Sequence, residues 1–412
     1  TYNGSDRGSF FHTINKTKTA AGARKLKNWL LFPLTSPDQI LERLGRVRLW
    51  KDQPEKLKTL RSLLSQMGDI ERRLGKIANP TCNARDFVSL KESLKSGLEI
   101  SKIYGFKDKK SLEIAFNLIE DIEKTIVDEP PLSIRQGNMI RQGFAEPLDE
   151  LIRLTTDSQS LLSEMEQREK EAHQISSLKI RYNQVFGFYI EVTNSHLDKV
   201  PKHYVRKQTL TNAERFITDE LYKLEQKVLS AKTKREEYEL AIFENVKHNI
   251  LKVSHALLTL AHEWSEIDVI AGFAWLSLEN NYCEPVFSND RSLKLVASRH
   301  AVIEVIAKEK FVPNDIELFP HGCLLLTGPN MAGKSTLMRQ VALTSLLFQV
   351  GSFVPASSAR LPLFDRLYTR IGASDSLTEG LSTFMVEMTE TAYLLKNATP
   401  HSLVILDEIG RG

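Results

Sequence analysis

One run of residues has the types and spacing that bind a nucleoside triphosphate. It fits the pattern G-x-x-x-x-G-K-[ST], in which backbone N–H groups cradle phosphates at the start of a helix. The lysine of this pattern reaches the β- and γ-phosphates, and the hydroxyl that follows it is a ligand of Mg²⁺. The run consists of Gly328, Pro329, Asn330, Met331, Ala332, Gly333, Lys334, Ser335 and Thr336.

The residues on either side of this run favour a phosphate-binding loop over a chance glycine turn. Residues 323–327 are mostly apolar and predict a short buried strand, and residues 337–343 predict the opening of a helix. The loop therefore lies where a strand meets a helix N-terminus, whose partial positive charge attracts anions.

A second apolar run, residues 403–406, ends in the two carboxylates Asp407 and Glu408. In ATPases this pattern places the first carboxylate on Mg²⁺, usually through water, and the second as the general base for the attacking water. A carboxylate pair in an ordinary turn is the alternative, and the phosphate-binding loop in the same chain argues against it. The pair is typical of ATPases that act as head-to-head dimers and complete each site in trans.

Ser382 precedes a predicted helix and follows the segment 378–380. A serine at this place fits two roles. It is either a plain helix N-cap or part of an anion site at the helix N-terminus.

Composition limits the class of protein without identifying it. With 412 residues, 42% of them hydrophobic, the chain is long enough for roughly two to four domains. A formal net charge of +3 is nearly neutral, so nucleic-acid binding would have to come from a local patch. The cysteines Cys82, Cys283 and Cys323 lack metal-ligand or disulfide spacing, which indicates reduced thiols in a cytosolic or nuclear protein.

The sequence contains no membrane or export signal that we recognise. No apolar run approaches the ~20 residues of a membrane-spanning helix, and no signal peptide precedes Thr1. The chain lacks an initiator Met, so we expect it to be a piece of a longer protein.

The periodicity predicts a multidomain α and α/β protein. Residues 147–170 predict a long amphipathic lever helix, and residues 212–260 predict a second long, charged helix. Between them, residues 178–182 alternate and residues 185–192 are β-branched and aromatic, which predicts two strands joined at 183–184. From residue 285 onward, short apolar runs between helical segments indicate an α/β domain.

A basic stretch covers this predicted β insertion. Six cations stand against Glu191 and Asp198, which fits sequence-independent contact with DNA phosphates, although an ordinary solvated face is the alternative. The cations are Lys179, Arg181, Lys199, Lys202, Arg206 and Lys207.

Several segments together resemble the MutS family of mismatch-repair ATPases. Near the nucleotide motifs the resemblance is carried by residues 327–336, 351–356, 369–375, 382–390 and 407–412. Upstream it is carried by residues 17–24 and 29–34, which resemble the family's core, and by residues 178–183, 186–192, 206–210 and 212–215, which resemble its clamp. The clamp argues against the clampless branch of the family.

The resemblance implies a domain division. The core or lever domain covers residues 1–171 and resumes at 223–282, the clamp covers 172–222, and a P-loop (ABC-type) ATPase domain covers 283–412. The family's mismatch-reading domain with its Phe-x-Glu wedge, and further ATPase strands with a dimerisation segment, are expected outside this chain.

The resemblance also implies roles for individual residues. Ser382 would face the γ-phosphate of the opposite subunit, and Asn330 would orient the attacking water. Phe311 would stack on adenine, although a core phenylalanine is the alternative. Arg299 and His300 resemble a family turn in which Ala301 replaces proline, so we assign no chemistry to His300.

The implied activity is that of a DNA-dependent ATPase. The resemblance implies a dimer with a second MutS-type subunit, and a homodimer is expected. The dimer would clamp mismatched duplex DNA and use ATP, ADP and Mg²⁺ to switch to a sliding clamp. A MutL-type repair protein would act downstream, in a bacterial cytoplasm at the nucleoid or in a eukaryotic nucleus.

Two alternatives stay open. A homologue that stabilises recombination junctions would have a similar core, clamp and ATPase, and competition between heteroduplex and four-way junction DNA separates the two. The chain alone could also be a DNA-binding module with little ATP turnover.

Overall fold

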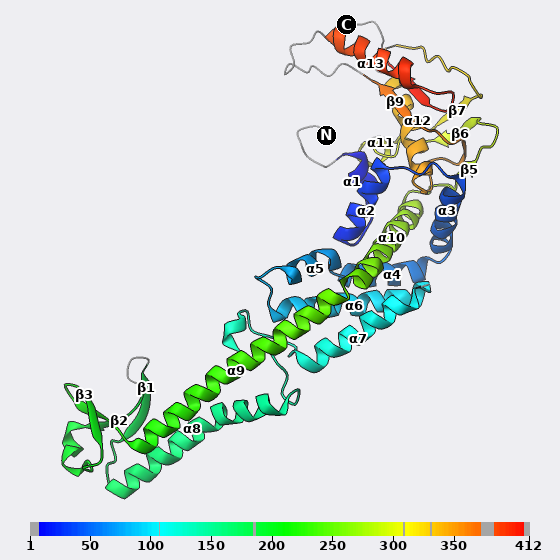
Figure 1. The fold of residues 1–412 in the computed structure, drawn as a ribbon. Helices are drawn as coiled ribbons and strands as arrows, with labels where there is room; N and C mark the ends of the chain where they lie inside the picture. Colours follow the sequence, from blue (N-terminus) through cyan, green and yellow to red (C-terminus); the bar gives the residue numbers. More distant parts are fainter. Residues whose placement is uncertain are drawn as a thin grey trace. The chain divides into compact units, whose positions relative to one another are not determined.

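Helices make up most of the described chain, and small sheets lie among them (Figure 1). The computed structural model describes residues 8–106, 108–183, 187–307, 310–329, 332–371 and 383–407. The chain divides into two compact units. Unit 1 comprises Thr1–Glu71, Ser93–Leu112 and Leu257–Gly412, and unit 2 comprises Arg72–Glu92 and Glu113–Ala256. The predicted multidomain character, with mostly helical parts and small sheets, is confirmed.

The first half of the chain is helical, as the apolar spacing predicts. Helices α5, α6 and α7 contribute residues to both units. The bounds are α1 Phe10–Ile14, α2 Ala20–Leu31, α3 Pro37–Lys51, α4 Pro54–Gln66, α5 Ile70–Ala78, α6 Ala84–Tyr104, α7 Lys109–Thr125 and the 3₁₀ turn η2 Ile134–Gln136.

Helix α10 (Ser254–Glu279) is the buried centre of unit 1 because it is apolar on most of its sides. Trp264 is fully buried, and its indole N–H donates to Ser101 Oγ at 2.9 Å. Gly97 faces the same ring, and a Cβ there would lie 2.5 Å from Trp264 Cζ2. The close approach of α6 to α10 therefore requires glycine at position 97.

A buried carboxylate on α10 fixes the start of α2. Asp268 has no exposed surface and accepts the backbone N–H groups of Lys18 (2.8 Å) and Thr19 (2.8 Å) and the Thr19 hydroxyl (2.7 Å). Thr19 Oγ1 in turn accepts the Gly22 N–H, so it caps α2. Each of these donors would be costly to bury without an acceptor.

The later part of unit 1 contains two small sheets. In the first, the strand order is β5-β8-β6-β7, with β5 parallel to β8 and the other pairs antiparallel; the second is the parallel pair β9 and β10. The bounds are β5 Val286–Phe287, β6 Leu293–Ser298, α11 Ile303–Ile306, β7 Asn314–Leu318, α12 Lys334–Gln349, β8 Ser358–Leu361, β9 Leu367–Arg370, α13 Thr383–Asn397 and β10 Leu403–Leu406.

The buried strand predicted at residues 323–327 is wrong. These residues have no regular secondary structure, and Leu325 is 82% exposed. An apolar run becomes a strand only where neighbouring strands satisfy its backbone. Among the described residues, β9 and β10 pair with each other, and the remaining strands of unit 1 form the other sheet. No described strand therefore pairs with residues 323–327 through backbone hydrogen bonds. The strands predicted at 293–296 and 403–406 are confirmed.

Unit 2 is built on two long helices that run side by side, with a four-stranded sheet between the end of one and the start of the other (Figure 1). We call α8 and α9 the lever helices and β1–β4 the clamp sheet. The clamp sheet is antiparallel, with strand order β1-β2-β4-β3. The bounds are α8 Glu146–His173, β1 Lys179–Asn183, β2 Gly187–Thr193, η3 Asn194–Lys199, β3 Val205–Thr209, β4 Ala213–Ile217 and α9 Asp219–Lys252.

The predicted start of the second long helix is wrong. Residues 213–217 form strand β4, and α9 begins only at Asp219. Phe216 and Ile217 are buried and fit an apolar helix stripe as well as a strand. The boundary is set by Thr218, which is extended and accepts the Leu221 N–H as an N-cap. The lever helix and the strand pair predicted at 147–170 and 178–192 are confirmed, while residues 184–186 lie outside the described part.

One apolar core joins the clamp sheet to the lever helices. Alternate residues of β2 and β4, among them Ile190, Val192 and Phe216, pack with residues of both helices. The buried members are Met165, Ile175, Leu178, Ile190, Val192, Tyr204, Phe216 and Leu221. A four-stranded sheet with one buried face needs such a support, because strands gain stability mainly from packing.

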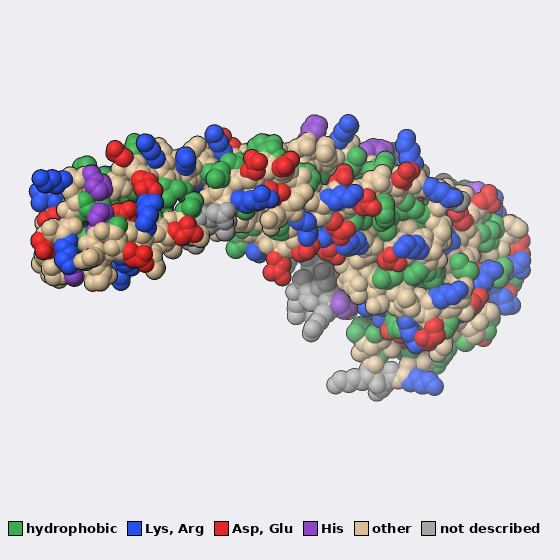
Figure 2. All heavy atoms as spheres, turned by 90° about the horizontal axis from the view of Figure 1, so that it is seen from below, with side chains coloured by type: hydrophobic (Ala, Val, Ile, Leu, Met, Phe, Trp, Pro, Cys, Tyr) green, Lys and Arg blue, Asp and Glu red, His purple; other side chains and the backbone are tan. Residues whose placement is uncertain are grey.

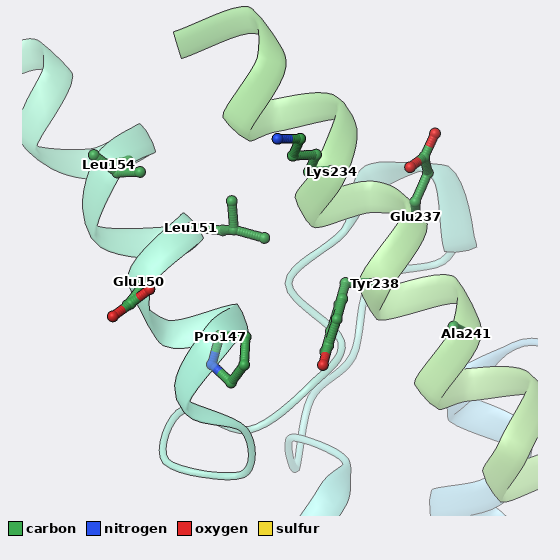
Figure 3. A pocket seen from close by; sticks show the side chains of 8 residues that line it. All are labelled: Pro147, Glu150, Leu151, Leu154, Lys234, Glu237, Tyr238 and Ala241. Atoms are coloured by element: carbon green, nitrogen blue, oxygen red, sulfur yellow. The ribbon is translucent and has the colours of Figure 1, made fainter. Parts of the chain in front are cut away.

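An open groove of about 460 Å³ lies between the lever helices, and Figure 3 shows the side chains that line it. Leu151 and Tyr238 extend into it from opposite helices. It contains none of the residues predicted to bind nucleotide or DNA. Within the described ranges, no helix is long and apolar enough to cross a membrane.

We expect Asp268→Asn to lower the free energy of unfolding of the chain by about 1–3 kcal/mol. Both carboxylate oxygens of Asp268 accept N–H or O–H donors, whereas an amide NH₂ would face one of these donors. Chemical denaturation monitored by tryptophan fluorescence measures the change. The control is Asp121→Asn, at an exposed position on α7, and an equal effect at both sites would contradict the assignment.

Candidate functional site

The predicted phosphate loop ends at a glycine that caps α12. Gly333 has φ +89°, a left-handed conformation that favours glycine, and α12 begins at the next residue. Lys334 Nζ donates to the carbonyl oxygens of Gly328 and Pro329, both at 2.8 Å. The ammonium group therefore lies over the loop, at the N-terminus of the helix, where an anion would gain from both charges.

The two motifs predicted to bind nucleotide meet in space. Ser335 Oγ, in the first turn of α12, donates a hydrogen bond to Asp407 Oδ2. Asp407 directly follows β10, and its N–H donates to the carbonyl of Arg370, the last residue of β9, at 2.8 Å. The parallel pairing of β9 and β10 thus carries the carboxylate to the helix N-terminus.

These two oxygens have the chemistry that Mg²⁺ requires. Mg²⁺ prefers hard oxygen ligands, takes few from the protein, and completes its octahedron with water and phosphate oxygens. A hydroxyl and a carboxylate at the mouth of a phosphate loop fit this donor set. Among the described residues no group of three or more His, Cys, Asp or Glu forms a metal cluster.

The other predicted nucleotide residues are placed only in part. Ala332 and Thr336 lie in the loop and in α12, and Phe311 is half-buried three residues before β7. Asn330, Met331, Ser382 and Glu408 lie outside the described residues. Their roles, and that of Phe311, stay predictions.

The sequence argument missed Arg370 in this region. Its carbonyl holds the Asp407 N–H, and its Nε lies 3.3 Å from Glu390 Oε2 on α13. Arg370 therefore connects β9 with both β10 and α13. The sequence feature that could have identified Arg370 is its position as the one charged residue, at the end of the strand 367–370.

The clamp sheet has one apolar and one polar face. The apolar face is the core described above. On the polar face, Lys179, Glu191, Arg215 and Gln208 lie opposite one another across the four strands. This alternation follows from the two-residue period of a strand, which turns successive side chains to opposite faces.

The cations predicted to contact DNA lie at both edges of this sheet. Lys179 and Arg181 are exposed on β1, one edge strand, and Arg206 and Lys207 are exposed on β3, the other. Lys202 is exposed just before β3. A register shift between Arg206 and Gln208 gives β3 a bulge at Lys207. Figure 2 shows Lys and Arg side chains gathered over the clamp sheet, at the left of the view, with acidic side chains among them.

Carboxylates reduce the charge of some of these cations. Arg206 Nη1 lies 3.3 Å from Glu214 Oε1, and Arg181 Nη1 lies 3.8 Å from Glu191 Oε1. Arg181 and Arg206 keep 53% and 63% of their side-chain surface exposed, so both can still reach a phosphate.

Arg215, at the centre of the polar face, was not predicted as a contact. Its guanidinium lies over the Tyr189 ring at 4.2 Å, donates to Gln208 Oε1 at 2.8 Å and lies 3.4 Å from Glu191 Oε2. It links three strands. Sequence reasoning missed it because residues 213–217 were assigned to a helix, and an alternating pattern around Arg215 was the available signal.

Comparison with known proteins identifies the family. Residues 1–274 match the family model for MutS domain III, and residues 324–412 match the model for MutS domain V. The chain therefore belongs to the MutS family, as its motifs predict.

Named relatives cover nearly the whole chain. It is 44% identical to the DNA mismatch repair protein MutS of Myxococcus xanthus (strain DK1622) over 421 residues, which is 99% of this chain and 47% of that protein. It is also 44% identical to the DNA mismatch repair protein MutS of Thermotoga neapolitana (strain ATCC 49049 / DSM 4359 / NBRC 107923 / NS-E) over 406 residues, 98% of this chain and 50% of that protein. The chain thus spans about half the length of these curated relatives.

Proposed function

We propose that this chain is the core, clamp and nucleotide-binding part of a DNA mismatch-repair ATPase. The observation that carries the proposal is the hydrogen bond between Ser335 and Asp407, which joins two distant nucleotide motifs in a chain that also has a cationic clamp sheet. The names of the relatives support mismatch repair as the process.

In this proposal, residues of the P-loop (ABC-type) ATPase domain hold ATP or ADP with Mg²⁺. Lys334 exchanges its two carbonyl partners for the β- and γ-phosphates, and Gly328 and Gly333 leave the backbone open to them. Ser335 and Asp407 hold Mg²⁺, whose role is to neutralise phosphate charge. Glu408 acts as general base on the attacking water, which Asn330 orients.

Two further residues would complete the nucleotide site. Phe311 stacks on the adenine, and Ser382 reaches the γ-phosphate bound by a second MutS-type subunit. Dimerisation therefore couples the two nucleotide sites. We propose that nucleotide exchange and hydrolysis switch the dimer from scanning mismatched duplex DNA to a sliding clamp that signals to a MutL-type protein.

The clamp sheet contacts the DNA backbone in this proposal. Its cations stand on two edge strands, where they can reach phosphates. Contacts of this kind bind any sequence and weaken as salt rises. Mismatch selection would then come from outside the clamp.

We expect Lys334→Ala, made in the full-length protein, to weaken ATP binding and hydrolysis about 10–100-fold. A charged hydrogen bond contributes roughly 1.5–3 kcal/mol, and each 1.4 kcal/mol changes affinity tenfold. Nucleotide titration and steady-state ATPase rates give the measurement. Lys396→Ala, at an exposed position on α13, is the matched control. Unchanged binding and turnover in Lys334→Ala would refute the nucleotide site.

We expect the double variant Lys179→Ala/Arg181→Ala to weaken binding of homoduplex DNA and to make it less dependent on salt. Loss of two phosphate contacts lowers the slope of log K against log salt concentration by about 1.8. Fluorescence anisotropy over a salt series measures this slope. Lys232→Ala/Lys252→Ala removes two exposed lysines of α9 as the control, and an equal change in the control would argue against the clamp as the contact.

A further inference from the structure

Two backbone N–H groups of the β1–β2 hairpin are bound by carboxylates of the lever helices instead of by strands. The Ile180 N–H donates to Glu166 Oε2 on α8 at 2.9 Å. The Phe188 N–H donates to Glu225 Oε1 on α9 at 3.2 Å. The hairpin is thus bound once on each strand, by a different helix in each case.

Both N–H groups lie where the sheet offers no partner. Strand β1 is an edge strand, so part of its backbone faces away from β2. Strand β2 pairs with β4 only from Ile190 onward, so the β4 side of Phe188 is unoccupied. An unpaired buried N–H is costly, and a hydrogen bond to a carboxylate is stronger than one to a neutral acceptor.

The Glu225 contact depends on a glycine. Glu225 is only 6% exposed, and a Cβ added to Gly187 would lie 1.7 Å from Glu225 Oε1. Gly187 also has φ +73°, which a side chain would strain. Residue 187 therefore leaves the space through which the carboxylate reaches the backbone of the next residue.

Glu166 is held in its acceptor form. Burial alone would raise the pKa of Glu166, but hydrogen bonds from Lys170 (2.5 Å) and from the Ile180 N–H outweigh burial and lower that pKa. The carboxylate is therefore ionised at neutral pH and available to Ile180.

The residue that Glu166 binds lies between two predicted DNA contacts. Lys179 and Arg181 flank Ile180 on β1 and project to the polar face, whereas the partly buried Ile180 packs on the core of the opposite face. Any slip of β1 relative to α8 would move both cations together.

We propose that Glu166 and Glu225 are positioning residues for DNA binding: each fixes one strand of the hairpin to a lever helix and thereby sets where Lys179 and Arg181 meet the backbone. This inference rests on the proposed DNA contact of the clamp sheet. The two carboxylates act through backbone groups and touch no phosphate themselves.

The test compares Ala and Gln variants of both positions in the full-length protein. A Gln side chain keeps an oxygen acceptor but loses the charge, whereas Ala loses both. Glu166→Ala/Glu225→Ala is expected to bind homoduplex DNA about tenfold more weakly, because two charged hydrogen bonds no longer hold the hairpin. Glu166→Gln/Glu225→Gln is expected to bind as tightly as the parent or more tightly.

The sign of the change separates positioning from simple electrostatics. Removal of negative charge near DNA should strengthen binding, so weaker binding by the Ala variant cannot come from charge. Hydrogen exchange at Ile180 and Phe188 provides the second readout, and it should become faster in the Ala variant but stay close to the parent in the Gln variant. Glu164→Ala/Glu236→Ala, at exposed sites on the same helices, is the control, and circular dichroism verifies folding.

Two outcomes would overturn the inference. If the Ala variant binds DNA as tightly as the parent, the apolar core alone positions the hairpin. If the Ala and Gln variants weaken binding equally, an oxygen acceptor at positions 166 and 225 is not what positions the hairpin. A parent protein that shows no salt-dependent duplex binding would instead refute the proposed function, while the exchange rates would still report whether the carboxylates hold the hairpin.

Discussion

The apolar core shared by the clamp sheet and the lever helices is the constraint on which unit 2 depends. A four-stranded sheet alone cannot bury Ile190, Val192 and Phe216. These side chains therefore pack against residues of α8 and α9 such as Met165 and Leu221. Since the strands alternate, burial of this face sends Lys179, Glu191 and Arg215 to the other. The polar face that we assign to DNA is thus a consequence of where the sheet is anchored.

Sequence patterns predicted the elements with strong periodicity and failed where a pattern fits two structures. The lever helix α8 and strands β1, β2, β6 and β10 follow from spacing alone. Residues 213–217 were assigned to a helix because Phe216 and Ile217 suit either period, and only the cap at Thr218 marks the boundary. Residues 323–327 were assigned to a strand from apolar content, which cannot reveal whether neighbouring strands are available.

The candidate sites divide in the same way. The motifs predicted Ser335 and Asp407 as ligands of Mg²⁺. The two side chains form a hydrogen bond because β10 runs parallel to β9. Charge counting located the clamp cations but not Arg215, whose place depends on strand register. A carboxylate that accepts a backbone N–H group, such as Glu225, cannot be found from motifs, because no side chain in the sequence identifies its partner. The residues predicted to bind nucleotide lie in unit 1 and the clamp sheet lies in unit 2, and helices α5, α6 and α7 contribute residues to both units.

Lysine footprinting tests most directly whether the clamp sheet is the DNA contact. The acetylation rate of each lysine of the full-length protein is measured by mass spectrometry with and without homoduplex DNA at low salt. The account predicts that DNA protects Lys179, Lys202 and Lys207, while Lys247 and Lys252 on α9 react at unchanged rates. Protection of the α9 lysines without protection of the clamp lysines would contradict it.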